Sequence, residues 1–430
     1  MDKKILVLSI SAWNSAVGMD TWPTLMEGRN PDHVANICLR GETPDSNVCN
    51  HYFYISENKV IKSIINRSIQ TGSKKDAAVA VQNDETDTDL KKHKARYQKM
   101  KKHRSFFFLM AREILWKVGK WKSRELYDFI MEFSPDVILY SMDGYIHFNR
   151  LCRYAKKIST AKSIGFFADD NFTYKQSRRF GDLAFRYFQR RSLKKLVRET
   201  DAFWAITDMT KEEADKVFGI DCTVITKPVL STPMYVEKKI EFPIHILYTG
   251  NLQIGRDKSL VKVVNALKKT PDPARKFVVD IYTRTVLEAD VEHSIKCDFC
   301  HIHPPIPQEE VLKLQKAADI LLFMEDIDGP DAKTARLSFS TKITDYLSAG
   351  KSILAIGSDD TAPIQYFIKN QAAIVATSEK EIEERFAEIV QNTDILVEYA
   401  SRACEIGKKN HNKEDILRTV DSTIRQVLDK

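Results

Sequence analysis

The stretch SFSTKITDYLSAGKSILAIG, residues 338–357, decides the fold that the sequence predicts. It predicts a polar loop, a helix over Thr341–Ala349, a stop at Gly350 and an apolar strand over Ser352–Gly357. Ser340 or Thr341 suits the N-cap of this helix, and glycine suits the residue that ends it. A helix followed directly by a buried strand is typical of α/β domains.

Lys342 and Asp345 are three residues apart, so they share one face of this helix near its start. The first amides of a helix lack partners and attract anions, and a lysine with two hydroxyls beside them suits a diphosphate. A carboxylate one turn further on suits the diol of a ribose. These residues fit a nucleoside diphosphate, although a capped surface helix with an ion pair would have the same sequence.

Apolar, β-branched runs of strand length recur along the chain, and most are continuous rather than alternating. Continuous runs are typical of strands covered on both faces, as in parallel sheets. Helical patterns separate many of them, which predicts doubly wound α/β sheets. The predicted strands are Ile5–Ile10, His33–Leu39, His51–Ile55, Asp136–Tyr140, Ser163–Ala168, Ala202–Thr207, Cys222–Lys227, Ile244–Gly250, Phe277–Tyr282, Cys297–Ile302, Asp319–Phe323, Ser352–Gly357 and Ala372–Ala376.

A chain of 430 residues is too long for one ordinary core, so two domains are expected. The series of strands pauses at Val229–Pro243, a polar segment with two prolines. We expect an N-terminal domain over 1–235, a C-terminal domain over 236–410 and a C-terminal helix over 411–430 that packs back on the N-terminal domain. Segment 70–105 is polar and is expected to be an exposed excursion.

Composition and charge narrow the class of protein. Hydrophobic residues make up 43% of the chain, and no apolar run is long enough to span a bilayer. The first strand begins without a signal-peptide pattern, and seven cysteines fit reduced thiols, so a cytoplasmic location is expected. The net charge of +7 is concentrated in Lys91–Arg104, which holds eight Lys or Arg residues and no acid.

This cationic run is followed by a helical pattern in which Phe107, Met110, Ile114 and Val118 lie roughly on one face. Segment 91–121 would suit an anionic membrane surface on the inner face of the cell membrane. Alternatively, the helix packs into the N-terminal domain. The run lacks the aromatic motif of an RNA-binding module, so no nucleic-acid partner is expected.

A second candidate phosphate loop is LYTGNLQIGRDKSL, residues 247–260. Its strand ends at Gly250, and a loop with Gly255, Arg256 and Lys258 leads into a helix. Glycines permit close approach of the backbone and arginine neutralises phosphate, although a solvated basic turn would look the same. The segment CDFCHIH, residues 297–303, lacks a second cysteine pair at zinc-site spacing, so no zinc site is expected there.

Four blocks of the sequence resemble the glycosyltransferases of GT-B fold, especially family four. KITDYLSAGKSILAIG is similar to their acidic helix and following strand, and HILYTGNLQIGR to the opening strand and phosphate loop of their donor domain. HPPIPQEEVLKLQKAADILLF is similar to their base-binding segment, and DKKILVLSISAWNSAVGMDTW to their first strand and the loop that approaches the donor phosphates. The resemblance implies two Rossmann-like, doubly wound domains that face a cleft.

The resemblance implies a cofactor-free, metal-independent and retaining transfer of a sugar from a nucleotide-diphosphate donor, a UDP-sugar, to a glycan or polyprenyl-linked acceptor in surface-polysaccharide synthesis. Asp169 and Asp170 follow a predicted strand and are the candidate catalytic residues, although acids there also cap helices. The candidate donor-binding residues are Gly18, Gly250, Asn251, Arg256, Ile306, Ser340, Thr341, Lys342 and Asp345.

The sequence departs from the family pattern of two glutamates in the acidic helix. The second position is Asp345, and Leu337 stands eight positions earlier, so the first acidic role is lost or has moved to Glu325 or Asp326. Asn251 stands where arginine is common, and Lys342 would supply the missing cation. Two alternatives remain open: a non-catalytic GT-B subunit that binds or regulates a partner transferase, and a sugar-nucleotide epimerase.

Overall fold

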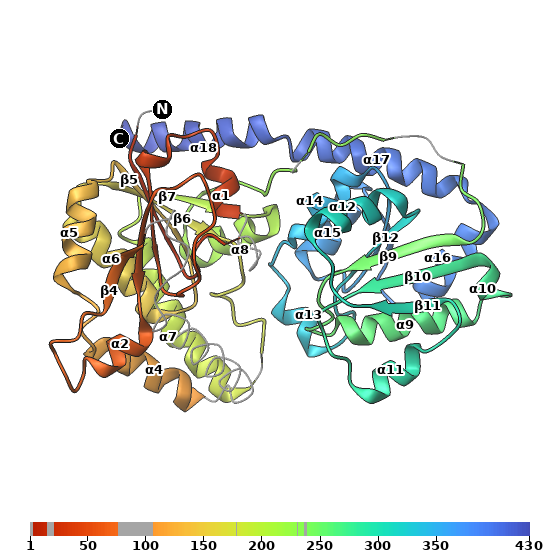
Figure 1. The fold of residues 1–430 in the computed structure, drawn as a ribbon, viewed down its shortest axis with the longest axis horizontal. Coiled ribbons are helices and arrows are strands. Elements are labelled where there is room, and N and C mark those ends of the chain that lie inside the picture. Colours follow the sequence, from red (N-terminus) through yellow and green to blue (C-terminus); the bar gives the residue numbers. More distant parts are fainter. Residues whose placement is uncertain (1–2, 15–20, 76–105, 178, 230, 236–238) are drawn as a thin grey trace. The chain divides into compact units, whose positions relative to one another are not determined.

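The computed structural model describes residues 3–14, 21–75, 106–177, 179–229, 231–235 and 239–430. The chain forms two compact units (Figure 1). The first contains the chain up to Ile225 together with Ile416–Lys430, and the second runs from Thr226 to Asp415. Each unit is built around its own sheet.

The first unit has an eight-stranded sheet in the order β4-β3-β2-β1-β5-β6-β7-β8, in which only the β3–β4 pair is antiparallel. Along the chain, β2 to β4 are added on one side of β1 and β5 to β8 on the other. The winding of the sheet therefore reverses between β1 and β5. The strands are β1 (Ile5–Ser9), β2 (Val34–Cys38), β3 (His51–Ile55), β4 (Gly72–Lys75), β5 (Val137–Ser141), β6 (Lys162–Phe167), β7 (Ala202–Ala205) and β8 (Cys222–Val224). The helices are α1 (Thr21–Met26), the 3₁₀ turn η2 (Pro31–His33), α2 (Glu57–Lys62), α4 (Phe106–Val118), α5 (Arg124–Phe133), α6 (Ile146–Ile158), α7 (Phe180–Val197) and α8 (Asp208–Phe218).

The second unit has a six-stranded, all-parallel sheet in the order β11-β10-β9-β12-β13-β14, so its winding reverses between β9 and β12. The strands are β9 (Ile244–Thr249), β10 (Phe277–Tyr282), β11 (Cys300–His303), β12 (Ile320–Met324), β13 (Ser352–Ile356) and β14 (Ile374–Ala376). The helices are α9 (Arg256–Lys268), α10 (Pro273–Lys276), α11 (Ala289–Ile295), α12 (Gln308–Ala317), α13 (Pro330–Thr334), α14 (Thr341–Ala349), α15 (Ala362–Asn370), α16 (Glu379–Gln391) and α17 (Asp394–Asn410).

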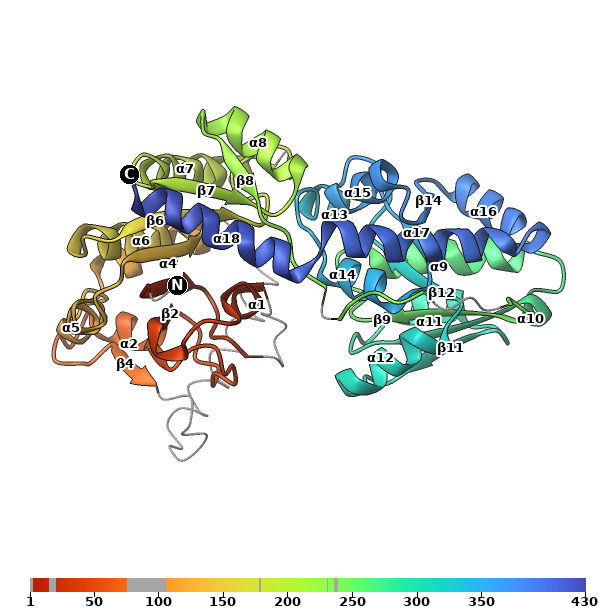
Figure 2. The ribbon, with the colours of Figure 1, turned by 90° about the horizontal axis from the view of Figure 1, so that it is seen from above.

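Two apolar cores cover the two faces of the second sheet. One core joins the sheet to α9, α11 and α16, and the other joins it to α14, α15 and α17. Burial of both faces explains why these strands are continuous apolar runs. The last helix is α18 (Lys413–Leu428) (Figure 2). Most of it belongs to the first unit, where its Asp421 forms an ion pair with Arg29.

The predicted α/β class with doubly wound sheets is confirmed, and a strand lies in every run that was predicted as one. Segment 70–105 begins with β4, an edge strand held by backbone pairing rather than by an apolar pattern; residues 76–105 lie outside the described residues. One strand boundary was wrong. The strand predicted from Cys297 begins at Cys300, because Cys297 and Cys300 pair with each other across a tight turn.

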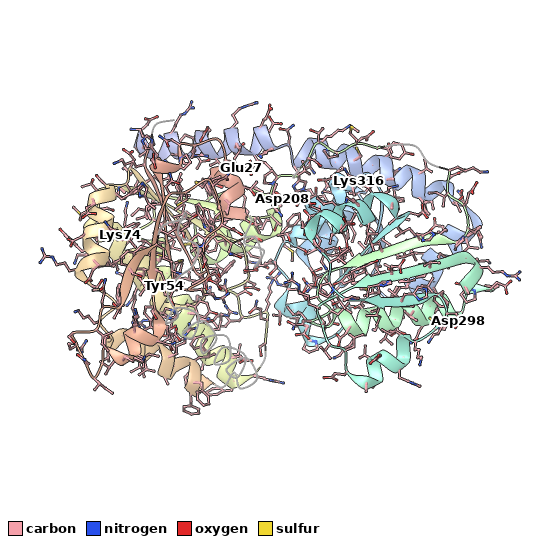
Figure 3. The ribbon with its side chains drawn as sticks, in the orientation of Figure 1. Glu27, Tyr54, Lys74, Asp208, Asp298 and Lys316 are labelled. Atoms are coloured by element: carbon pink, nitrogen blue, oxygen red, sulfur yellow. The ribbon has the colours of Figure 1, made fainter. Side chains whose placement is uncertain are left out.

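Lys74 shows how the exposed edge of the first sheet is kept from pairing further. The side chain lies at the rim of the unit (Figure 3), where its ammonium donates to Glu132 at 2.6 Å. Charged side chains on an edge strand discourage association with another sheet.

Among the described residues, no helix is long and apolar enough to cross a membrane.

Candidate active site

The candidate site lies at the carboxyl ends of β9 and β12 in the second unit. These two strands are neighbours, and the winding of the sheet reverses between them. Helix α9 begins shortly after β9, and α14 also begins at this edge of the sheet. Ligands of doubly wound folds bind in the crevice at such a switch point, so the topology itself selects this edge.

Lys342 folds back from the first turn of α14 onto the end of β9. Its ammonium nitrogen is 4.0 Å from the centroid of the Tyr248 ring and donates to the Tyr248 hydroxyl at 2.9 Å. That hydroxyl in turn donates to the carbonyl oxygen of Asn251 at 2.6 Å. The relay holds one cation over the loop that follows β9, where a diphosphate would need it.

Arg256 is the second cation and links the loop after β9 to the end of β12. Its guanidinium donates to Glu325 at 2.8 Å, to the carbonyl of Met324 at 3.1 Å and to the Asn251 side chain at 3.1 Å. Glu325 is 2% exposed, so the pair is a buried ion pair rather than a surface one. Arg256 is therefore oriented by protein groups before any ligand binds.

The loop between Gly250 and α9 is folded in unusual backbone conformations. Gly250, Ile254 and Gly255 have φ angles of 136°, 62° and 73°. A positive φ is strained for a β-branched residue such as isoleucine, and such strain concentrates at ligand-binding loops. A side chain at Gly255 would run into Asp326, which caps the loop before α13 by accepting from the amides of Gly329 and Asp331.

Gly250→Ala is expected to weaken nucleotide binding by about tenfold, because the added methyl group would overlap the Lys342 ammonium and displace it. The backbone there also disfavours alanine. The Kd for UDP, measured by calorimetric titration, checks this expectation. Gly219→Ala is the matched control, since Gly219 also has a positive φ but nothing lies near its Cβ position. Equal loss of affinity in both variants would contradict the proposed position of Lys342.

The pKa of Lys342 is lowered to about 7, chiefly by burial and then by the nearby Arg256 charge, while Glu325 and Asp345 oppose the shift. A bound diphosphate favours the charged form, so binding above neutral pH should take up a proton. We expect the Kd for UDP to rise between about pH 7 and about pH 9, by up to about tenfold per unit. Lys342→Met should remove this slope, and a flat profile in the unmodified protein would contradict it.

The lowered pKa of Lys342 should also affect the stability of the protein without ligand. The pKa of Lys342 lies below the value it has in an unfolded chain, so the unfolded chain holds more protons between the two values. The free energy of unfolding should therefore gain a contribution as pH rises from about 7 to about 10. Adding UDP should reduce this gain, because the ligand favours the protonated lysine in the folded state.

The first turn of α14 is accessible. Ser340, Thr341, Lys342 and Asp345 are all partly exposed, so anions can approach the amides of the turn. Ser340 stands at the N-cap, one of the two positions predicted for it, although no hydrogen bond from its side chain caps the helix. Gly350 ends the helix in the left-handed conformation, as predicted.

The remaining predicted donor residues fall in different places. Asn251 joins Arg256 and Tyr248 as described above. Ile306 is half-buried in the loop after β11, at the same carboxyl edge but two strands away from β9. Gly18 lies outside the described residues. The structure thus brings Lys342, Arg256, Asn251 and Gly250 together.

The two predicted catalytic acids follow β6 in the first unit and differ in environment. Asp170 is buried and accepts from the Thr173 amide at 3.0 Å and from its hydroxyl at 2.5 Å, so it holds the turn. Asp169 is exposed. Asp143, which follows β5, has a pKa raised to about 6, chiefly by burial, with the Asp169 charge adding to the shift. Asp143 and Asp169 thus follow the carboxyl ends of two neighbouring parallel strands, β5 and β6.

Tyr248 and Asp143 were missed from the sequence. Tyr248 looks like one more buried residue of an apolar strand, and only its position two residues before Gly250 marks it as a strand-end hydroxyl. Asp143 is an acid just after a predicted strand, which is the same signal that singled out Asp169. Asp143 could have been found by that rule, whereas Tyr248 could not.

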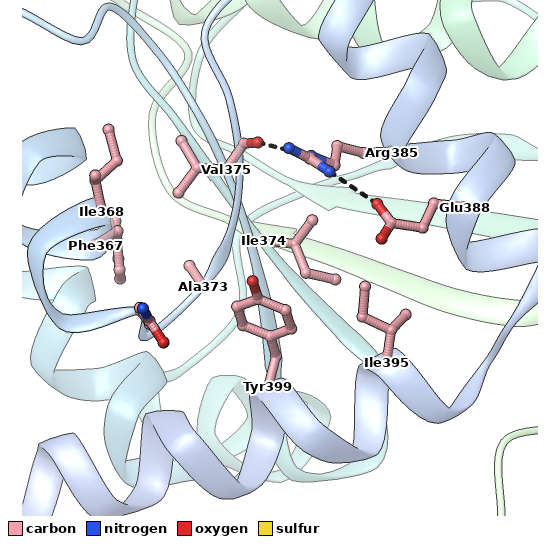
Figure 4. Close-up of a pocket in the computed structure, with 10 residues that line it drawn as sticks. Phe367, Ile368, Ala373, Ile374, Val375, Arg385, Glu388, Ile395 and Tyr399 are labelled. Atoms are coloured by element: carbon pink, nitrogen blue, oxygen red, sulfur yellow. Dashed lines mark hydrogen bonds and ion pairs between the residues drawn. The ribbon is translucent and has the colours of Figure 1, made fainter.

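A hollow of about 170 Å³ lies elsewhere in the second unit (Figure 4). It is lined by α15, α16, α17 and β14, with Phe367, Ile374 and Tyr399 on its walls. Its cation, Arg385, already donates to the Val375 carbonyl at 3.1 Å and to Glu388 at 2.8 Å. Since that charge is satisfied by the protein and the hollow lies away from the switch point between β9 and β12, we do not place the donor there.

No group of His, Cys, Asp and Glu residues in the described part of the chain is arranged to hold a metal ion. His303, from the segment considered for zinc, instead interacts with Asp280 at 2.7 Å and stacks on Tyr282.

At the level of sequence, neither a family model nor a curated protein matches the chain. Solved structures do match it over nearly its whole length. Sucrose-phosphate synthase from Thermosynechococcus elongatus matches with a TM-score of 0.61 at 11% identity, covering 99% of both chains. The chain has the GT-B fold. HepE from Anabaena, in complex with UDP and glucose, shares this fold with a TM-score of 0.61 at 10% identity, covering 99% of this chain and 100% of its own.

A third structure is the trehalose-6-phosphate protein from E. coli bound with UDP-2-fluoro glucose. It matches with a TM-score of 0.59 at 10% identity, over 98% of this chain and 99% of its own. The TM-scores of these matches establish a common architecture, and identities near 10% establish nothing beyond the fold.

Proposed function

We propose that the protein is a glycosyltransferase that takes a sugar from a UDP-sugar and passes it to a glycan or polyprenyl-linked acceptor. The observation that carries the proposal is the placement of Lys342 and Arg256 at the switch point of the second sheet, beside the start of α14. HepE in complex with UDP and glucose and the E. coli protein bound with UDP-2-fluoro glucose support UDP as the nucleotide.

Departure of the diphosphate leaves negative charge that the chain's own groups would stabilise. Lys342, held by Tyr248, and Arg256, held by Glu325, are fixed cations that need no reorganisation during the reaction. The amides at the start of α14 add oriented dipoles. With these groups in place the transfer needs no metal ion, and the resemblance to family four supports retention of the anomeric configuration.

Asp345 and the acids of the first unit complete the assignment. Asp345, one turn into α14, would accept hydrogen bonds from the ribose diol. The position of the first glutamate of the family pattern holds Leu337, which is apolar and fully buried and therefore has no acidic role. Asp143 and Asp169 would contact the transferred sugar or the acceptor hydroxyl. Asp170 and Asp326 are assigned to holding turns, and Glu325 to orienting Arg256.

A thermal-shift series with UDP, GDP and CMP tests the proposal, because a ligand that binds only the folded state raises its stability. We expect UDP to give the largest rise, about 2.7 kcal/mol at a concentration of about 100 times its Kd. Stabilisation by none of the three nucleotides would contradict the proposal and favour a non-catalytic subunit. Release of an altered UDP-sugar without acceptor would favour an epimerase.

A further inference from the structure

Helix α4 presents its apolar side to solvent and its charged side to the core. Its buried residues are Glu113 and Trp116, whereas Phe107, Ile114 and Val118 are 79%, 55% and 47% exposed. A surface helix of a globular domain normally does the opposite, because burial of apolar groups is what holds it in place. We therefore expect the exposed apolar side of α4 to be covered by a binding partner.

The inward side is fixed by polar contacts that leave the helix little freedom to turn over. Glu57 accepts from Arg112 at 2.6 Å and 2.8 Å and from the Trp116 indole at 2.9 Å. Glu113 accepts from the His147 ring at 2.9 Å, and Trp116 stacks on that ring with centroids 4.5 Å apart. Breaking such a buried network to bring the apolar side inward would be costly.

The outward side is a continuous stripe. Phe107, Ala111, Ile114 and Val118 follow each other at intervals of four, three and four residues, and all four are exposed. These residues, named here the α4 stripe, cover three turns of one helical face. Phe180, at the start of α7 and 88% exposed, is next in sequence to Gly181, which packs against Phe106 at the start of α4.

The described elements at the α4 stripe carry mostly positive charge. The only acid of α4 is the buried Glu113. Helix α7 and its flanks, Arg179–Arg198, carry seven Lys or Arg residues and the single acid Asp182. A second copy of this chain would be repelled by the same charges.

We propose that the α4 stripe and Phe180 form a docking surface for an anionic lipid bilayer. Aromatic and aliphatic side chains would enter the boundary between headgroups and acyl chains, while the surrounding cations bind the headgroups. The inference uses no residue of the nucleotide site, so it goes beyond the proposed function and can fail or hold independently of it. It would place the protein where a polyprenyl-linked acceptor is found.

Flotation of the full chain with vesicles tests the docking surface. We expect binding to vesicles of phosphatidylglycerol and phosphatidylcholine, much weaker binding to phosphatidylcholine alone, and release as salt is raised. The double variant Phe107→Ser, Ile114→Ser should bind the anionic vesicles about tenfold less or weaker still, since both apolar anchors are lost. Val286→Ser is the matched control, because Val286 is 94% exposed in the second unit.

Both replaced side chains are exposed, so the double variant should keep the Tm and the Kd for UDP of the unmodified protein. Equal binding of the double variant and the control to anionic vesicles would overturn the proposal. So would equal binding of the unmodified protein to both kinds of vesicle. A dimer in solution that the double variant dissociates would assign the stripe to a second copy instead.

Discussion

Lys342→Met is expected to raise the Kd for UDP by about 30-fold, which corresponds to a loss of about 2 kcal/mol. Of the two cations at the candidate site, the Lys342 ammonium is neutralised less by the protein. Arg256 is paired with the Glu325 carboxylate, whereas Lys342 contacts the ring and the hydroxyl of Tyr248. A methionine keeps the length of the side chain and removes only the charge and its hydrogen bonds. Calorimetric titration with UDP measures the change.

The control for this variant is Lys316→Met, on the exposed side of α12 in the same unit (Figure 3). It should bind UDP as the unmodified protein does. Lys342→Met should also keep the Tm or raise it slightly, because burial disfavours the charged lysine in the free protein. Equal losses of affinity in the two variants, or a fall in Tm that accounts for the loss, would count against the site.

Arg256→Met is expected to lower the free energy of unfolding by about 3–5 kcal/mol, because it leaves the Glu325 carboxylate buried without its partner. Glu325→Met should cost a similar amount by stranding the guanidinium. The double variant should lose much less than the sum, since two apolar side chains of similar size then replace the pair. Urea unfolding of the three variants measures these differences.

The exposed pair Lys269–Glu383 in the same unit provides the comparison. Lys269→Met should lower the free energy of unfolding by less than about 1 kcal/mol, because water screens a surface ion pair. A loss in Arg256→Met as small as that in Lys269→Met would show that Glu325 is not a buried charge held by Arg256. The orientation of Arg256 before ligand binding would then lack its support.

The fold was predictable because a parallel strand that is buried on both faces has a continuous apolar sequence. β3 and β10 have the predicted bounds, His51–Ile55 and Phe277–Tyr282. β4 was not predictable, since Gly-Ser-Lys-Lys has no apolar pattern and is a strand only because β3 offers it an edge. The sequence left two orientations of α4 open, because an apolar helical face has the same periodicity whether it meets a core or a membrane surface.

The parts of the candidate site that lie within one segment of the sequence could be predicted, and the contacts between segments could not. The start of α14 and the loop before α9 were found from capping residues, glycines and cations near each other in the sequence. The contacts of Arg256 with Glu325 and of Lys342 with Tyr248 join segments that meet only because β12 lies next to β9. Such contacts depend on strand order, which no local pattern contains.

A crystal structure of the protein with UDP would locate the nucleotide. We expect diphosphate oxygens about 3 Å from the Lys342 ammonium and from the amides at the start of α14, with Arg256 still paired to Glu325. UDP bound in the hollow beside Arg385, or anywhere away from the carboxyl ends of β9 and β12, would contradict this expectation.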